Sequence, residues 1–204
     1  MMNNYHYIIA GLPELLLKGE NKDFSYESLR NEIYMWCSSK DRRVIDWLEF
    51  GNKDSNLNIH FYRAALHHHN SFIREYFMMD LQIRNRKVDY VAGNNSAISV
   101  SNAYRIEPSG CDLTLEEGDA SELGRIFQTN DILEKEQMLD KYKWEKIDSF
   151  TTFNYFDINR ILAFLSKAML IERWNRLDRE QGMMLFEKLV QEIKGTYKGV
   201  NYKG

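Results

Sequence analysis

The sequence contains few of the residues that interrupt regular structure. Its 204 residues include only two prolines and eleven glycines. A sheet-rich fold needs a turn about every ten residues, and those turns draw heavily on glycine and proline. The scarcity of both residues therefore disfavours a sheet-rich fold and favours long helices.

The chain also contains few cysteines and has only a small excess of negative charge. The two cysteines, Cys37 and Cys111, occur without a secretory pattern, so we expect reduced thiols in the cytosol. The net charge is −3, and both signs are mixed along the chain. Because such a chain creates no field that would hold a polyanion, we expect no nucleic-acid partner.

Long hydrophobic runs are absent as well. No window approaches eighteen uninterrupted apolar residues, so we expect no segment that spans a membrane. The apolar stretch "YIIAGLPELLL" lacks a preceding basic region and contains Pro13 and Glu14, which disfavours a signal peptide. The sequence therefore predicts a cytoplasmic protein.

The residues that are present predict an ordered, helical protein. Hydrophobic residues make up 44% and aromatic residues 13% of the chain, which excludes a disordered class. Apolar residues recur at three- and four-residue steps over residues 26–37, 39–51 and 57–92. The last range fits either one long helix or two helices with a break near His69 and Asn70.

A change of character divides the chain into two predicted lobes. Residues 93–118 are mostly polar and small and contain several glycines, whereas helical periodicity resumes over residues 119–204. We therefore predict an all-α fold with an N-terminal lobe (1–92), a connection (93–118) and a C-terminal lobe (119–204).

Local signals mark several helix ends. Ser38 with Asp41, and Asp119 with Glu122, have the spacing of a capping box, and Asp23 or Ser25 could start an earlier helix. We expect Gly51 to take a left-handed conformation after a helix. We also expect two separate C-terminal helices, one over residues 154–174 and a last one that ends at Gly195.

No motif predicts a catalytic, metal or cofactor site. The run His67 to His69 cannot converge on one ion, because neighbouring residues on a helix point about 100° apart. All five histidines lie within residues 1–69, and no glycine-rich phosphate loop occurs. We therefore expect no cofactor, no metal and no catalytic residue.

Two similar helical segments carry the structural or interface candidates. In "REYFMMDLQIRNRKVDYV" Asp80 precedes Arg84 by four residues, and in "NYFDINRILAFLSKAMLIERW" Asp157 precedes Arg160 by three. Each acid lies beside an apolar stripe, where it forms either a surface ion pair or a bond to another helix or a partner. The spacing of the two acids fits a duplicated helical unit, although their surrounding residues match inexactly.

Three segments resemble known proteins: "NNYHYIIAGLPELLLKG", "YFMMDLQIRNRKVDYVAGN" and "YFDINRILAFLSKAMLIERWNRL". They resemble an uncharacterised family of bacterial proteins of similar length whose genes lie with those of V/A-type rotary ATPases. The chain is also similar to the funnel-shaped component of these ATPases that is called C, or d in eukaryotic V-ATPases, and that we call the socket subunit. In that protein an acid followed by "LNI"-like residues recurs on an inner helix, and "DLQIRNR" and "DINRI" occupy such positions.

The resemblance implies a non-catalytic coupling subunit with two of the three helical lobes of the socket subunit. Its partners would be the membrane rotor ring at one end and the central stalk at the other, in proton or sodium transport. The protein would be peripheral to the inner membrane through these partner subunits, and it would need no cofactor.

Two other functions remain open from the residues alone. The chain could be an unrelated helical interaction scaffold or regulator, in which the two acids form ordinary structural pairs. An enzyme that uses Asp80 and Asp157 for acid and base catalysis would need both carboxylates in one cleft.

Overall fold

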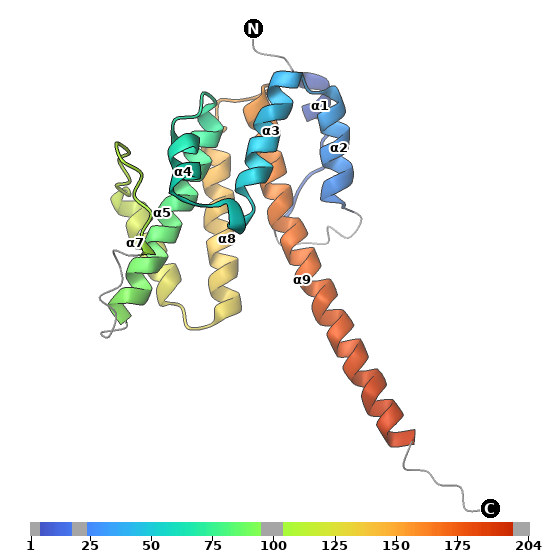
Figure 1. The fold of residues 1–204 in the computed structure, drawn as a ribbon. Coiled ribbons are helices and arrows are strands. Elements are labelled where there is room, and N and C mark those ends of the chain that lie inside the picture. The colour runs from blue at the N-terminus through green and yellow to red at the C-terminus, as the bar shows by residue number, and fades with distance from the viewer. Residues whose placement is uncertain (1–4, 18–23, 95–103, 198–204) are drawn as a thin grey trace, which may run out of the picture.

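The computed structural model describes residues 5–17, 24–94 and 104–197 (Figure 1). Within these ranges the regular structure is entirely helical, which confirms the predicted all-α class. The helices are α1 (His6–Ala10), α2 (Tyr26–Trp36), α3 (Ser39–Gly51), the 3-10 helix η1 (Asp54–Asn56), α4 (Ile59–Leu66), α5 (Ser71–Asn94), α7 (Glu117–Gln128), α8 (Ile132–Ser149) and α9 (Ile158–Tyr197).

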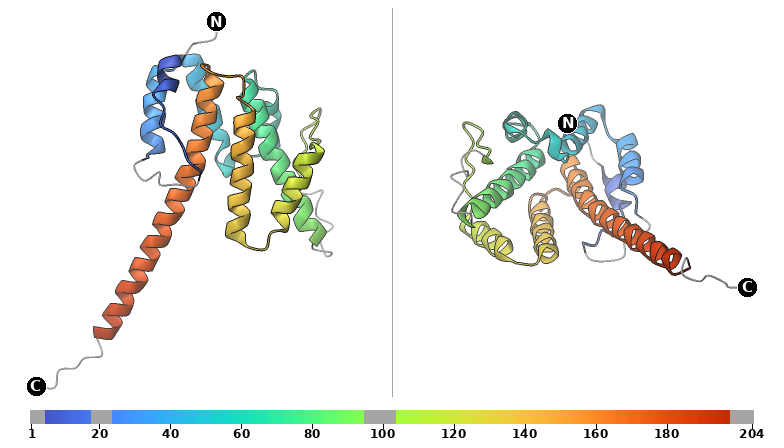
Figure 2. Two further views of the ribbon diagram at one scale, coloured as in Figure 1. Left: turned by 180° about the vertical axis from the view of Figure 1, so that it is seen from behind. Right: turned by 60° about the horizontal axis from the view of Figure 1, so that its bottom comes forward.

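The helices form a body from which the end of α9 projects. In the body, α5 packs against α3, α4, α7 and α9, while α9 also contacts α2, α3 and α8. The views in Figures 1 and 2 show α9 leaving the body and continuing as a single straight helix. The first half of α9 is therefore a core element, and its second half is an arm.

One hydrophobic core joins the two halves of the chain. Leu48 and Phe77 from the first half belong to the same buried cluster as Leu123, Ile161 and Leu165 from the second. Burial of these apolar side chains is the main force that holds the helices together. The core thus continues across the predicted boundary at residues 93–118.

Side-chain caps begin several helices where the sequence predicts them. The Ser25 side chain caps α2 by accepting a hydrogen bond from the Ser28 N–H, and Ser38 caps α3 by accepting one from the Asp41 N–H. Each cap satisfies a backbone donor that the first helical turn leaves free.

The predicted capping box of Asp119 and Glu122 is wrong. α7 begins after Glu116, which makes no side-chain cap, and Asp119 lies inside the first turn. Its carboxylate instead accepts a hydrogen bond from Lys146 Nζ on α8 at 2.6 Å. An ion pair between two helices has taken the place of the local cap.

The break near His69 and Asn70 is confirmed. α4 ends at Leu66 and α5 begins at Ser71. Between them the Asn70 side chain accepts a hydrogen bond from the Ile73 N–H at 3.0 Å, which caps α5. His68 stabilises the turn, since its Nδ1 accepts a hydrogen bond from the Asn70 N–H at 3.1 Å.

The prediction for Gly51 is also wrong. Gly51 is the last residue of α3, and among the described glycines only Gly110 has a positive φ, of 80°. A Cβ atom at Gly51 would lie 2.3 Å from ring atoms of both Phe61 and Phe77. The position needs glycine because two aromatic rings approach the backbone.

The two predicted C-terminal helices are one helix. α9 runs unbroken from Ile158 to Tyr197, with Gly182 in its exposed part. Glycine lowers helix stability but does not prevent a helix, and no proline occurs here to stop it. Near the N-terminus, residues 6–10 form the short helix α1.

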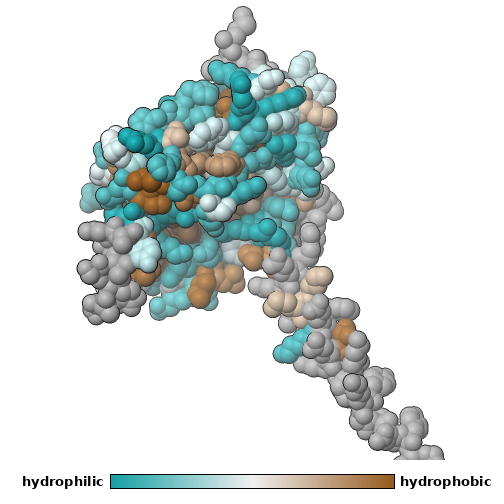
Figure 3. All heavy atoms as spheres, in the orientation of Figure 1, coloured by the Kyte–Doolittle hydropathy of each residue, from teal (hydrophilic) through white to brown (hydrophobic). Residues whose placement is uncertain are grey.

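The face of the body that Figure 3 shows is mainly hydrophilic. Figure 3 shows hydrophilic residues over most of the visible face, interrupted by small hydrophobic areas. No helix within the described ranges is both long enough and apolar enough to cross a membrane.

Candidate functional site

Asp80 and Arg84 link α5 to two neighbouring elements. The Tyr62 hydroxyl on α4 donates to Asp80 Oδ2 at 2.5 Å, and Arg84 Nε donates to the same oxygen at 3.1 Å. Arg84 Nη2 also donates to Asp54 in η1 at 2.5 Å. The predicted pair is therefore part of a network that holds α4, η1 and α5 together, which we call the Asp80 network.

Burial and charge fix the protonation of the two donors in the Asp80 network. Burial and the negative charge of Asp80 raise the pKa of Tyr62, so its hydroxyl stays protonated and donates. Burial acts to lower the pKa of Arg84, but the charge of Asp80 and the hydrogen bonds to its carboxylate partners outweigh burial and raise it. Tyr62 and Arg84 therefore both keep their protons near neutral pH.

The amides of the same motif anchor the connection that follows α5. The buried Asn85 side chain donates to the Ile106 carbonyl at 2.9 Å and accepts from the Ile106 N–H at 3.0 Å. One turn earlier, Gln82 Nε2 donates to the Thr114 carbonyl at 3.1 Å. The segment "DLQIRNR" thus braces α5 against α4 through its acid and against residues 104–116 through its amides.

Asp157 has a different role, because it caps α9. Its Oδ1 accepts hydrogen bonds from the backbone N–H groups of Asn159 at 3.1 Å and Arg160 at 3.3 Å. Its Oδ2 accepts from Asn154 Nδ2 at 2.5 Å. The Arg160 side chain is exposed, and the bond between the two residues involves only the Arg160 backbone.

The two acids occupy different places in their helices. Asp80 lies in the interior of α5, whereas Asp157 directly precedes α9. The residue that precedes α5 in the same way is Asn70, whose Nδ2 donates to Asn159 Oδ1 at 2.7 Å. The Asn159 side chain also donates to Ser71 Oγ at 3.3 Å. This set of contacts, which we call the Asn70–Asn159 clamp, joins the starts of α5 and α9.

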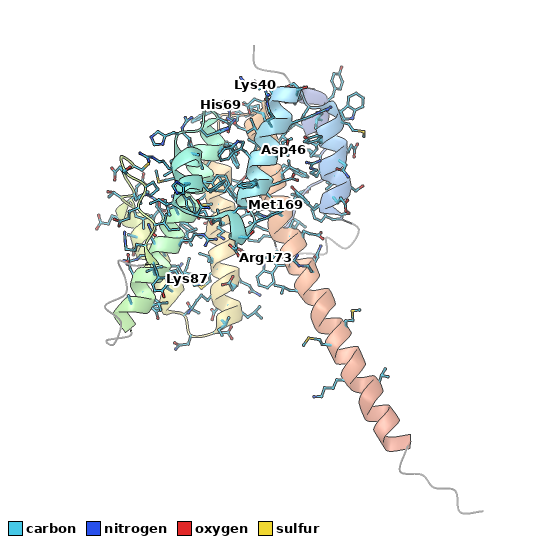
Figure 4. The ribbon with its side chains drawn as sticks, viewed as in Figure 1. Lys40, Asp46, His69, Lys87, Met169 and Arg173 are labelled. Carbon is cyan, nitrogen blue, oxygen red and sulfur yellow. The ribbon has the colours of Figure 1, made fainter. Side chains whose placement is uncertain are left out.

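A cavity of about 610 Å³ lies between α3, η1, α5, α8 and α9. Asp80 and Arg84 line it, together with Met169 and Arg173 from α9, which Figure 4 labels. Asp157 is not among its lining residues. The structure therefore does not bring the two acids into this cleft, as shared acid and base catalysis would require.

The charges around the cavity are mixed. The cations are Lys53, Arg84, Lys143, Arg173 and Arg176, and the acids are Glu49, Asp54, Asp80 and Glu172. The lining therefore has no dominant charge. It is better suited to contact a polar protein surface than to bind a small ion of one charge.

A buried acid that the sequence patterns do not single out lies where α9 leaves the body. The Asp140 side chain on α8 is 1% exposed and accepts hydrogen bonds from Arg173 Nη2 and from Trp174 Nε1, the latter at 2.7 Å. Asp140 Oδ1 and Arg173 Nε are buried without a hydrogen-bond partner among the described residues. A buried carboxylate needs hydrogen-bond donors, and Asp140 finds them in Arg173 and Trp174. These two hydrogen bonds fix α8 to α9.

The signal for Asp140 was present but weak. Asp140 follows Leu139 and precedes Tyr142, both buried, so it lies beside the apolar stripe of α8. Its partners lie more than thirty positions further along the chain. Only the fold reveals the pairing.

Histidine and cysteine provide no further site. Among the described residues, no three His, Cys, Asp or Glu side chains gather closely enough to hold a metal ion. Cys37 and Cys111 do not form a disulfide. Burial, together with the charge of Asp41, raises the pKa of Cys37 to about 11, so this thiol stays protonated and unreactive.

Comparison with known proteins places the chain in a family. The family model described as "Protein of unknown function (DUF2764)" matches residues 2–57 and 49–196. The chain belongs to this family. The two matches include α5 and all but the last residue of α9, and thus the Asp80 network and the Asn70–Asn159 clamp. No curated protein and no solved structure matches the chain.

Proposed function

We propose that this chain is a non-catalytic component of a bacterial V/A-type ATPase, similar in role to the socket subunit. In this role it couples the central stalk to the membrane rotor ring during proton or sodium transport. It is cytoplasmic and reaches the inner membrane through its partner subunits. The resemblance to the socket subunit motivates the proposal, and α9 is the observation that supports it best.

The outer half of α9 has the properties of a protein-binding element. Leu177 is 38%, Met183 62% and Met184 68% exposed, although all three are apolar. A lone helix in water is marginally stable, and most helices gain stability by packing an apolar face against another element. The described part of the body does not pack against these residues. A partner that covers them would therefore stabilise the outer half of α9.

The body has the properties of a rigid base for that element. The Asp140 contacts fix α9 to α8, and the Asn70–Asn159 clamp fixes the start of α9 to α5. A coupling subunit needs shape and rigidity rather than a reactive group, and this arrangement supports such a role.

Co-purification tests the proposal. A tagged chain expressed in its own host should retain the ATPase central-stalk and rotor subunits through purification. The double variant Met183→Ser/Met184→Ser should lose most of them, because it removes exposed apolar area from α9. Lys188→Ser, an exposed substitution on the same part of α9, is the matched control and should retain them.

Two results would contradict the proposal. One is a fully coupled ATPase in a strain that lacks the gene. The other is a stable complex with proteins that include no ATPase component, which would support the alternative function of an unrelated helical scaffold or regulator.

A further inference from the structure

We propose that one end of the body binds an anionic lipid surface. This end is formed by residues 5–10, 35–43 and 151–160, and we call it the aromatic end. Its exposed apolar side chains are Tyr7, Met35, Trp36, Phe153, Tyr155 and Phe156. The inference does not depend on the proposed ATPase role, and each can fail without the other.

The apolar side chains of the aromatic end are largely exposed. Tyr7 is 94%, Phe153 87% and Trp36 72% exposed. Single exposed apolar residues are common on soluble proteins, but a group of them at one place marks a binding surface.

Hydrogen bonds and ring contacts bring the three segments together. The Tyr5 N–H donates to the Phe156 carbonyl at 2.8 Å, and the ring centroids of His6 and Phe156 lie 4.7 Å apart. The Tyr5 hydroxyl accepts from the Ser38 N–H at 3.2 Å, which places the α2–α3 junction beside α1. In Figure 1, α1, the α2–α3 junction and the start of α9 lie together at the top of the body.

The charge of the aromatic end is opposite to that of the whole chain. Its three segments contain the cations Lys40, Arg42, Arg43 and Arg160 and the acids Asp41 and Asp157, whereas the whole chain has a net charge of −3. Figure 4 labels Lys40 at this end.

The two acids of the aromatic end both accept hydrogen bonds from within the chain. Asp41 is buried and accepts hydrogen bonds from the Tyr5 hydroxyl and from Ser38 Oγ. Asp157 is occupied in capping α9. Lys40, Arg43 and Arg160 remain exposed, so the outward charge is positive.

The geometry favours a lipid surface over a folded protein. Five of the six apolar side chains are more than 60% exposed, so they project from the surface into solvent. A folded partner needs complementary hollows for such side chains, whereas lipid headgroups move aside for them. Trp and Tyr prefer the interface of a bilayer, and Lys and Arg are attracted to anionic lipids.

Vesicle binding tests the inference. The purified full chain is mixed at low salt with vesicles of phosphatidylcholine alone, or of phosphatidylcholine with phosphatidylglycerol, and the bound fraction is measured by co-sedimentation. We expect binding to the anionic vesicles and little to the neutral ones. Lys40→Ala/Arg43→Ala should lower the partition coefficient by about tenfold or more, as expected for two cations near an anionic surface.

A fluorescence measurement locates the contact. Tryptophan emission should shift to the blue with anionic vesicles, and Trp36→Phe should remove most of the shift because the other tryptophans are partly covered by the fold. Met183→Ser/Met184→Ser, outside the aromatic end, should bind vesicles like the parent chain. All variants change exposed residues, and circular dichroism verifies that each remains folded.

Three results would overturn the inference. The first is no binding to either vesicle, and the second is equal binding of the parent and the Lys40→Ala/Arg43→Ala variant. The third is binding through the aromatic end to a purified partner protein in detergent, with no binding to vesicles, which would assign this end to a protein interface.

Discussion

Asp80 accepts hydrogen bonds from side chains on two helices, and Tyr62 depends on it most. The Tyr62 side chain is fully buried, so loss of Asp80 leaves its hydroxyl without its hydrogen-bond acceptor. We expect Asp80→Ala to lower the free energy of unfolding by about 1–3 kcal/mol, as measured by urea denaturation.

Two comparisons separate this effect from a surface ion pair. Asp54→Ala removes the other acid of the Asp80 network, whose side chain is 92% exposed, and should cost less than about 0.5 kcal/mol. Tyr62→Phe should reduce the cost of Asp80→Ala in a double-mutant cycle. Equal costs for Asp80→Ala and Asp54→Ala would show that the network does not brace the helices.

Asp157 stabilises α9 through the backbone rather than through the Arg160 charge. Asp157→Ala should therefore lower the free energy of unfolding by about 0.5–2 kcal/mol, the usual effect of losing an N-cap. Asp157→Ser should restore most of the loss, and Arg160→Ala should have little effect. A loss with Arg160→Ala as large as that with Asp157→Ala would support an ion pair instead.

His68 makes stability depend on pH. Burial, with a contribution from His69, lowers the pKa of His68, and its Nδ1 must be unprotonated to accept from the Asn70 N–H. The unfolded state therefore binds a proton at His68 more readily than the folded state does. The contribution of neutral His68 to the free energy of unfolding is present above the ordinary pKa of about 6.5 and is lost as the pH falls below it.

The His68 contribution is measured as a difference between variants. Urea midpoints at pH 7.5 and 5.5 should fall further apart for the parent chain than for His68→Gln, both pH values being about one unit from the ordinary histidine pKa. His67→Gln, an exposed histidine beside it, is the control and should behave like the parent. The same pH dependence in parent and His68→Gln would exclude the role.

Two aromatic rings explain why position 51, at the end of α3, is a glycine. Gly51→Ala should lower the free energy of unfolding by about 1–3 kcal/mol, because the new methyl group has no space beside Phe61 and Phe77. Thermal denaturation monitored by circular dichroism measures the loss, and Phe77→Leu in the same chain should recover part of it.

Gly182 provides the matched control for Gly51. It lies inside α9, and a Cβ atom there would meet nothing within 4 Å. Gly182→Ala should therefore raise helix content or leave stability unchanged, since alanine favours a helix by about 1 kcal/mol over glycine. If both substitutions destabilise the protein equally, the steric explanation for Gly51 is wrong.

The sequence predicts those elements whose signals are local. Apolar periodicity and the Ser38 cap predict α3, and the i,i+4 spacing predicts that Asp80 contacts Arg84. These features depend on residues within one or two helical turns, so the chain near them contains the necessary information.

Features that depend on distant residues could not be predicted in this way. Tyr62 lies 18 positions from Asp80, and Asn70 lies 89 positions from Asn159. The reason for glycine at position 51 likewise depends on rings contributed by α4 and α5. Sequence patterns identified the participants as polar or apolar, but only the packing of the helices determined the pairs.

At the scale of the whole molecule, stability should differ along α9. Residues such as Ile161 and Leu165 are fully buried, whereas Met183 and Met184 are exposed. Backbone amides in residues 178–197 should therefore exchange with deuterium much faster than those in residues 158–171, as measured by mass spectrometry. Equal protection that rises with protein concentration would instead show that α9 pairs with a second copy of the chain.

The continuity of α9 has a mechanical consequence. Its 40 residues correspond to a continuous helix about 60 Å long. The Asp140 contacts hold this helix near its middle, and the Asn70–Asn159 clamp lies at its inner end. A sideways force on the outer half is transmitted as torque to the start of α5 without passing through a loop. A small displacement of the outer half of α9 therefore strains the amide contacts of Asn159 inside the body.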